Sequence, residues 1–222
     1  MADVSRVWQN KLFARTIGAS YDLAMERPTA ARRFGRLMMG ADVDRIYRAM
    51  GAVGEMPNGS AILDVPCGGG IALRELRNSQ RVRYVGVDIS PAMLDRARRR
   101  ISPQHQSDIA IIEGDIERMP FGNRLFDLCI CFNGLHCVPD PPAAVREIAR
   151  CLKPGGRLIG EFATRGQLRR ADAYMALLRA TGTFGRAGTP NEARQWFAEA
   201  GLLVETFECT GAIAHFVVRR PE

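Results

Sequence analysis

The chain of 222 residues lacks the features that mark membrane-spanning and secreted proteins. It contains no run of about 18 uncharged apolar residues, the length that a membrane-spanning helix needs. Its first residues, MADVSRVWQNKLF, mix acidic, basic and polar side chains and lack the apolar stretch of a secretory signal. We therefore expect a cytoplasmic protein without a transmembrane segment, for which contact with a membrane surface stays open.

Metal-binding patterns are also missing. The chain has three histidines and six cysteines, but no two cysteines form a CxxC pair and no histidines complete a zinc pattern. Cys129 and Cys131 are two apart in a strongly apolar run, so they should face the same side of a strand. Because unpaired cysteine behaves as a small buried hydrophobe, we expect structural thiols in a reducing compartment and no metal.

Lysine is scarce, and arginine supplies almost all of the net charge of +7. A basic balance is compatible with nucleic acid, an anionic membrane surface or an acidic substrate. The densest group (Arg96, Arg98, Arg99 and Arg100) continues a helical pattern and is typical of a solvated helix face. The arginines are not interleaved with the aromatic side chains that stack on bases, so this pattern does not favour nucleic acid.

Strand-like and helix-like segments alternate from residue 61 onward. Such alternation predicts a doubly wound, mostly parallel sheet with right-handed crossovers. The segment 125–132 is very apolar, as expected when both faces of a parallel strand are buried. The other expected strands are 61–65, 83–87, 109–113 and 157–162, and the expected helices are 71–77, 91–100 and 141–151.

The rhythm changes after residue 162. We expect helices over 167–180 and 191–200, then two strands, 203–208 and 213–219, joined by a glycine-containing turn that indicates a hairpin. The predicted fold is a Rossmann-like α/β sheet of seven mostly parallel strands that ends in an antiparallel hairpin. Residues 1–55 form a helical N-terminal cap or lid and residues 56–222 the main domain, with an insertion at 165–190.

A glycine-rich bend follows the first strand in LDVPCGGG, residues 63–70. Glycines at this position let a ligand approach the backbone, and they expose a helix N-terminus that suits an anion such as a carboxylate. A dinucleotide fingerprint needs a small residue where Leu73 stands, and a P-loop needs Lys and Ser or Thr where Ile71 and Ala72 stand. The spacing therefore disfavours pyrophosphate binding.

Three aspartates are expected at neighbouring strand ends. Asp88 ends the second strand, where an acid can accept the hydroxyls of a ribose. We expect Ser90 to cap the following helix, which leaves Asp88 available for a ligand. Asp115 follows the third strand and Asp64 ends the first. An acidic rim of this kind repels phosphate but suits a nucleoside that carries a cationic sulfonium and an amine.

Five motifs in order, LDVPCGGG, VGVDIS, GDIERMPF, FDLCICFNGLHCV and LKPGGRL, resemble the class I S-adenosylmethionine-dependent methyltransferases. The resemblance is closest to the small-molecule branch that includes the ubiquinone and menaquinone biosynthesis methyltransferases. It implies S-adenosyl-L-methionine as cofactor, S-adenosyl-L-homocysteine as product, and a small hydrophobic or aromatic metabolite as methyl acceptor. The family usually has its first loop glycine where this chain has Pro66, which lacks an N–H.

The resemblance also implies roles for individual residues. The methionine portion would be held by the first strand end and its loop, the adenosine by the ends of the second and third strands, and the sulfonium by the loop after the fourth. A Tyr–Asp pair in the leading segment would close over the cofactor as a lid. The residues for the methionine portion are Asp64, Gly68 and Gly70, and those for the adenosine are Asp88, Ile89, Met93, Asp115 and Ile116. Asn133 would face the sulfonium, and Tyr21 with Asp22 would form the lid over the cofactor.

His136, in the loop after the fourth strand, is the candidate catalytic residue. An ordinary histidine pKa near 6.5 suits a general base, which is needed only if the acceptor must lose a proton. A structural histidine in an apolar turn is the alternative reading.

Two other functions stay open at this stage. The basic balance would also fit a nucleic-acid methyltransferase, and Pro66 would fit an S-adenosylmethionine-binding protein without catalysis. Neither the acceptor, the atom that is methylated nor the oligomeric state follows from the sequence.

Overall fold

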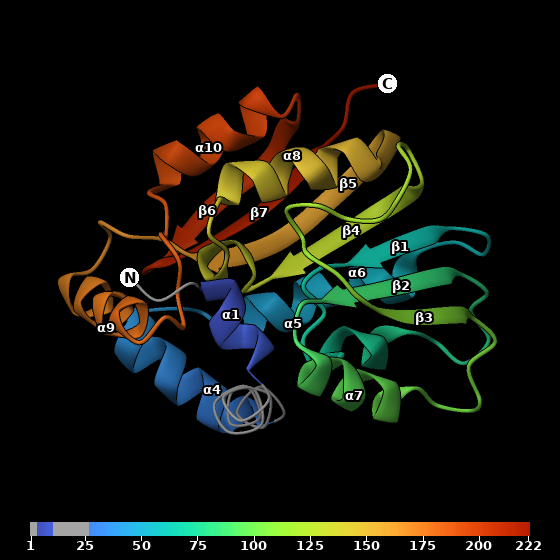
Figure 1. Ribbon diagram of the computed structural model, residues 1–222, viewed down its shortest axis with the longest axis horizontal. Coiled ribbons are helices and arrows are strands. Elements are labelled where there is room, and N and C mark those ends of the chain that lie inside the picture. The colour runs from blue at the N-terminus through green and yellow to red at the C-terminus, as the bar shows by residue number, and fades with distance from the viewer. Residues whose placement is uncertain (1–3, 11–26) are drawn as a thin grey trace.

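Seven strands form one sheet in the computed structural model, which describes residues 4–10 and 27–222 (Figure 1). The strand order is β3-β2-β1-β4-β5-β7-β6. The first five strands are parallel, and β7 runs antiparallel to both of its neighbours. The predicted fold class is therefore confirmed. The strands are β1 (Ala61–Asp64), β2 (Arg83–Asp88), β3 (Asp108–Glu113), β4 (Phe126–Phe132), β5 (Leu152–Ala163), β6 (Leu203–Thr210) and β7 (Ile213–Arg219).

Helices cover both faces of the sheet. On one face, α8 (Pro141–Cys151) and α10 (Pro190–Glu199) pack against the sheet, and on the other lie α5 (Asp44–Met50), α6 (Ala52–Glu55) and the 3-10 turn η3 (Ile71–Glu75). The helix α7 (Pro91–Arg100) packs beside β2, β3 and η3. Around the carboxyl ends of the strands lie α1 (Val4–Gln9), α4 (Pro28–Phe34), the π-helical turn η2 (Gly35–Met39), the 3-10 turn η4 (Leu135–Cys137) and α9 (Arg169–Ala180).

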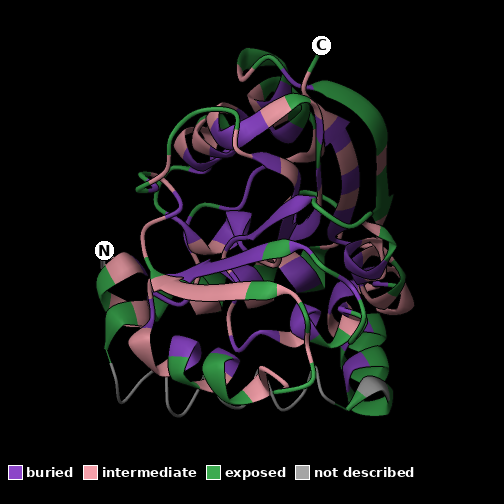
Figure 2. Ribbon diagram, turned by 90° about the vertical axis from the view of Figure 1, so that its right-hand side faces the viewer, coloured by how far each residue is buried: buried purple, intermediate pink, exposed green. Residues whose placement is uncertain are grey.

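Burial follows the alternation of side chains along β4. Cys129 and Cys131 belong to the core on the α8 side, whereas Leu128 and Ile130 belong to the core on the α5 side. The prediction that the two cysteines share a side is confirmed, and all six cysteines are free thiols. Figure 2 shows that the central strands are mostly buried, and the edge strand β3 is partly exposed.

Three local predictions need correction. Ser90 stands at the N-cap of α7, but its buried hydroxyl has no hydrogen-bond partner among the described residues; its backbone N–H donates to Asp88. Residues 71–75 form a single 3-10 turn, since Gly70 is left-handed and Leu76 is already extended. β5 begins at Leu152 instead of residue 157, because a register shift opposite β4 absorbs the LKPGG segment.

No helix in the described part of the chain is long and apolar enough to cross a membrane.

Candidate active site

A cavity of about 620 Å³ opens at the carboxyl ends of the parallel strands. Its lining includes residues that follow β1 and β4, between which the strand order reverses, and this is the usual ligand position in open α/β sheets. Segments before β1 (α1, α4 and η2) and the segment between β5 and β6 (α9 and the following loop) line its far side. The predicted site residues that line this cavity are Gly68, Asp88, Ile89, Met93, Asp115, Ile116, Asn133 and His136.

Two predicted residues do not line the cavity. Asp64 is buried and accepts a hydrogen bond from the Tyr84 hydroxyl, and burial raises its pKa to about 7. Gly70 faces α7, where an added Cβ would lie 2.9 Å from the Cβ of Ala97. In this structure both residues support the loop from below instead of facing a ligand. Tyr21 and Asp22 lie outside the described residues.

Asp88 is the central polar residue of the site. Its Oδ2 accepts the Gly68 N–H and its Oδ1 accepts the Ser90 N–H, both at 2.8 Å. Burial raises the pKa of this carboxyl to about 6, although the backbone N–H groups act in the opposite direction. The carboxylate retains acceptor capacity beyond these backbone partners, because an ionised carboxylate has about four acceptor positions.

Two neighbouring loops complete the polar end of the cavity. Asp115 accepts the Glu117 N–H through Oδ1 at 2.9 Å. Asn133 adopts φ +54°, a left-handed conformation that asparagine tolerates better than most residues. Its backbone N–H donates to the Glu161 carbonyl at 2.9 Å, and its Nδ2 donates to Glu161 Oε1 at 3.4 Å. The loop after β4 is thereby tied to the end of β5.

Pro66 fits the loop because a glycine faces it. A Cβ added to Gly134 would lie 2.2 Å from Cδ of Pro66, so the ring occupies the space that a side chain at position 134 would need. Pro66 itself lines the cavity. The departure from the family's usual glycine is thus matched by a complementary glycine in the loop after β4.

His136 is buried, and its ring packs on that of Phe184 with 4.3 Å between centroids. Its Nδ1 accepts the Ala163 N–H at 3.0 Å, so this nitrogen carries no proton. Burial lowers the pKa of His136 to about 3, which keeps the ring neutral near pH 7. The proton of the neutral ring therefore lies on Nε2, which makes His136 a hydrogen-bond donor. This geometry favours a donor role for His136 over the general base that the sequence suggested.

A buried carboxylate and a second histidine also line the cavity, and sequence reasoning missed both. Glu161 Oε2 lies 2.9 Å from His215 Nδ1, and His215 Nε2 lies 2.8 Å from the Thr210 hydroxyl. That hydroxyl also accepts the Asp42 N–H at 3.3 Å. β5 and β7 place Glu161 directly opposite His215 in their antiparallel register. The sequence predicted the β6–β7 hairpin, but it did not predict the register of β7 against β5.

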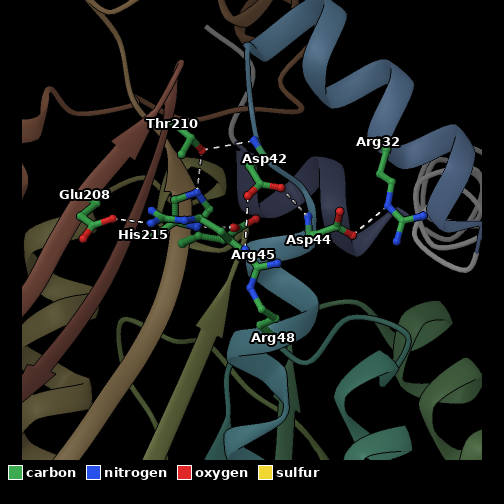
Figure 3. Close-up of polar contacts among 9 residues, drawn as sticks. Arg32, Asp42, Asp44, Arg45, Arg48, Glu208, Thr210 and His215 are labelled. Carbon is green, nitrogen blue, oxygen red and sulfur yellow. Dashed lines mark hydrogen bonds and ion pairs between the residues drawn. The ribbon is translucent and has the colours of Figure 1, made fainter.

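The segment before the sheet is held to the hairpin beside this pair (Figure 3). Arg45 on α5 forms an ion pair with Glu208 on β6, and Arg48 forms one with Asp42 at 3.3 Å. These contacts place Asp42 at the edge of the cavity.

The rest of the cavity is apolar. Trp8 lines it and donates from Nε1 to the Thr183 carbonyl at 3.0 Å, which ties α1 to the loop after α9. Phe34 packs edge-on against Tyr174 with ring centroids 5.8 Å apart. The apolar lining includes Trp8, Phe34, Met39, Val43, Ile46, Tyr174, Leu178, Phe184 and Ile213.

The charged lining has one sign. In the described part of the chain, four carboxylates and no lysine or arginine line the cavity, although the whole chain carries a net charge of +7. The carboxylates are Asp42, Asp88, Asp115 and Glu161. The same part of the chain contains no group of three His, Cys, Asp or Glu residues arranged as metal ligands.

Comparison with known structures shows that solved methyltransferases share this Rossmann-like fold. A chain of the Haloferax volcanii complex between a methyltransferase and a methyltransferase activator superposes with a TM-score of 0.69 at 20% identity, over 91% of this chain and 98% of that one. A geranyl diphosphate methyltransferase gives a TM-score of 0.66 at 14% identity, over 80% and 77% of the two chains. At these identities the likeness concerns the fold.

The family follows from sequence relatives. Residues 63–160 match the family model described as a methyltransferase domain. The ubiquinone biosynthesis O-methyltransferase of Coxiella burnetii is 31% identical over 166 residues, 71% of this chain and 68% of that protein. The demethylmenaquinone methyltransferase of Mycobacterium tuberculosis is 34% identical over 164 residues, 72% of this chain and 65% of that protein. The chain belongs to the class I S-adenosylmethionine-dependent methyltransferase family, as its motifs predicted.

A third relative is matched over a shorter stretch. The phthiotriol/phenolphthiotriol dimycocerosates methyltransferase of Mycobacterium leprae is 37% identical over 103 residues, 46% of this chain. That match spans 37% of the relative's own length, and the match to the demethylmenaquinone methyltransferase spans 65% of that protein.

Proposed function

We propose that the protein transfers the methyl group of S-adenosyl-L-methionine to a small hydrophobic acceptor of the quinone or phenol type. The observation that carries this proposal is the division of one cavity into an acidic end at the strand tips and an apolar end under α1, α4 and α9. The carboxylates at the strand tips, Asp88 and Asp115, favour a ligand that bears a sulfonium and an ammonium group. The apolar end suits a ring with an aliphatic substituent.

The residues at the acidic end fit this cofactor. Asp88 would accept the ribose hydroxyls, since its oxygens retain acceptor capacity and its position is set by Gly68 and Ser90. Ile89 and Met93 would pack on the adenine, and Asp115 and Ile116 would meet its edge. Bound there, the cofactor would supply a methyl group on a positively charged sulfur. Asp64 and Gly70 would act from below, by fixing the loop that carries Gly68.

Alignment of donor and acceptor is the main catalytic contribution expected from the chain. Holding two reactants in line can contribute about 7–11 kcal/mol to lowering a barrier. His136 would donate from Nε2 to an oxygen of the acceptor and orient it. Glu161, held by His215 and Asn133, would take the proton that the acceptor loses when a neutral hydroxyl or ring carbon is methylated.

The names of the relatives support this acceptor class, because two of them are enzymes of demethylmenaquinone and ubiquinone metabolism. The acidic lining speaks against the nucleic-acid alternative, since a polyanion requires cations around the reacting group.

The proposal is tested in two steps. Calorimetric titration should show binding of S-adenosylhomocysteine and no comparable binding of ATP or NAD. Release of S-adenosylhomocysteine should then be followed with a demethylmenaquinol analogue, a catechol and a single-stranded oligonucleotide as acceptors. We expect turnover with the first or second acceptor. Turnover with the oligonucleotide alone, or tighter binding of ATP than of S-adenosylhomocysteine, would overturn the proposal.

A further inference from the structure

Exposed apolar side chains gather on the helices that roof the apolar end of the cavity. Phe34, Leu37 and Leu177 are 51%, 71% and 62% exposed, values more typical of charged residues. Phe34 also lines the cavity, so the exposed surface is continuous with the cavity wall. Single exposed apolar residues are ordinary, but a group of large ones beside a cavity mouth usually marks an interaction surface.

The three residues lie on one helical layer. Arg170 of α9 donates from Nε to the Leu37 carbonyl at 2.8 Å, and one turn further along α9 the Tyr174 ring meets Phe34. Leu177 follows Tyr174 by three residues and is therefore its neighbour on the helix surface. Position 170 contacts 37 and position 174 contacts 34, so the two helical segments run in opposite directions, and Figure 1 shows α9 beside α4. We refer to α4, η2 and α9 as the roof helices.

The charge of the roof helices is strongly positive. Residues 28–39 contain Arg32, Arg33 and Arg36 and no acidic residue. Helix α9 contains Arg169, Arg170 and Arg179 and a single acid, Asp172, whose Oδ1 accepts the Gly166 N–H. Apolar side chains flanked by arginines are the composition of helices that lie in the headgroup region of anionic bilayers.

We propose that the roof helices dock on an anionic lipid surface. Leu37, Phe34 and Leu177 would insert among the acyl chains near the headgroups, and the arginines would contact lipid phosphates. The site would then open toward the bilayer, so an apolar acceptor could enter the cavity without crossing water. This use of the surface rests on the proposed function, whereas the docking itself does not.

The test uses the full chain and vesicles. Co-sedimentation should show binding to phosphatidylglycerol vesicles, weaker binding to phosphatidylcholine vesicles, and a decrease with salt. The pair Leu37→Ser and Leu177→Ser, and separately the pair Arg33→Glu and Arg36→Glu, should each lower the partition coefficient at least tenfold. The matched control is Leu203→Ser on β6, which is 51% exposed and pairs with Arg219 at the sheet end opposite Ile213. That control should bind as the wild type does.

Several results would overturn the docking proposal. They are equal binding to neutral and anionic vesicles, an equal loss in the Leu203→Ser control, or concentration-dependent dimerisation that Leu37→Ser and Leu177→Ser abolish. Thermal unfolding and S-adenosylhomocysteine affinity, measured on every variant, show whether the fold and the cofactor end persist. Vesicle binding without any S-adenosylhomocysteine binding would leave the docking surface in place and contradict only the proposed function.

Discussion

Asp88 connects two segments of the chain through its own carboxylate. Gly68 lies in the loop after β1 and Ser90 starts α7, and each donates a backbone N–H to a different oxygen of Asp88. Burial at this position opposes ionisation, while the backbone N–H donors of Ser90, Gly68 and Ile89 favour it. The loop and the helix start are therefore positioned by the group that would also contact the ribose.

Replacement of Asp88 by Asn should weaken binding of S-adenosylhomocysteine by about 10- to 100-fold, since hydrogen bonds to charged groups contribute about 1.5–3 kcal/mol. Wild-type affinity should fall as pH drops through about 6, because protonation of Asp88 removes acceptor capacity. Calorimetry between pH 5 and 8 measures both effects. Unchanged affinity in the variant would contradict the ribose assignment.

Replacement of His136 by Asn should reduce kcat without changing the shape of its pH profile between pH 6 and 9. The imidazole has a pKa of about 3 and does not titrate in that range, so it acts only as a donor. Steady-state kinetics on both forms provides the measurement. Loss of an acidic limb near pH 6.5 in the variant would show that His136 is a base after all.

Replacement of Glu161 by Gln should lower kcat at least tenfold for an acceptor that loses a proton, because positioned proton transfer typically contributes 10²–10⁴-fold. Affinity for S-adenosylhomocysteine should change less than twofold. Glu205→Gln is the matched control, since Glu205 is a β6 carboxylate paired with Arg219 at 3.1 Å and does not line the cavity. Equal kcat values for wild type and Glu161→Gln would rule out this proton acceptor.

At the scale of elements, the strands were predictable where burial is two-sided or glycine and proline mark the ends. β4 was expected at 125–132 and runs Phe126–Phe132, and α8 was predicted with its exact observed bounds, Pro141–Cys151. β5 began earlier than expected because LKPGG has the composition of a turn, and only pairing with β4 shows that it continues the strand. A single sequence contains no signal for that pairing.

The site residues also divide into those that the sequence predicts and those that depend on strand pairing. Eight predicted residues line the cavity because they lie at the carboxyl ends of strands or in the segments just after them, and strand ends can be located from composition. Asp64 also ends a strand, but its carboxylate accepts a hydrogen bond from the Tyr84 hydroxyl instead of lining the cavity. The direction of its side chain depends on the pleat of β1 at that position. The Glu161–His215 pair depends on the register of β5 against β7, and a shift of one residue would separate the two side chains.

The link between α1 and the loop after α9 should make Trp8 a reporter of the apolar end. The chain has two tryptophans, and Trp196 packs near Phe162, away from this end. In a Trp196→Phe variant, titration with an apolar quinone analogue should shift or quench Trp8 emission. The matched Trp8→Phe variant should show no saturable change. A saturable response that persists in Trp8→Phe would place the quinone elsewhere.

For the molecule as a whole, charge is segregated. Arginines supply most of the positive charge of the chain and outnumber acids on the roof helices, whereas the charged residues that line the cavity are carboxylates. This arrangement favours a cationic ligand inside and an anionic partner outside. It also places several carboxyl groups in surroundings with little water, which has a consequence for stability.

Asp64→Asn should stabilise the ligand-free protein above pH 7. Burial raises the folded-state pKa of Asp64 from an ordinary 3.8 to about 7, so its contribution is present below pH 3.8 and is lost as pH rises toward 7. A shift of this size corresponds to about 4 kcal/mol at 1.36 kcal/mol per unit. Urea unfolding at pH 4 to 8 should therefore show a wild-type decline that is smaller in the variant. Parallel curves for the two proteins would contradict this assignment.

The turn between β6 and β7 limits the number of residues that this part of the chain can contain. Gly211 has φ +56°, an added Cβ would lie 2.1 Å from the Met39 carbonyl oxygen, and Ala212 donates its N–H to that oxygen at 2.7 Å. Loss or gain of one codon here would turn His215 to the opposite face of the sheet and away from Glu161. Surface loops usually tolerate such length changes, but we expect homologues of this protein to show none at the β6–β7 turn.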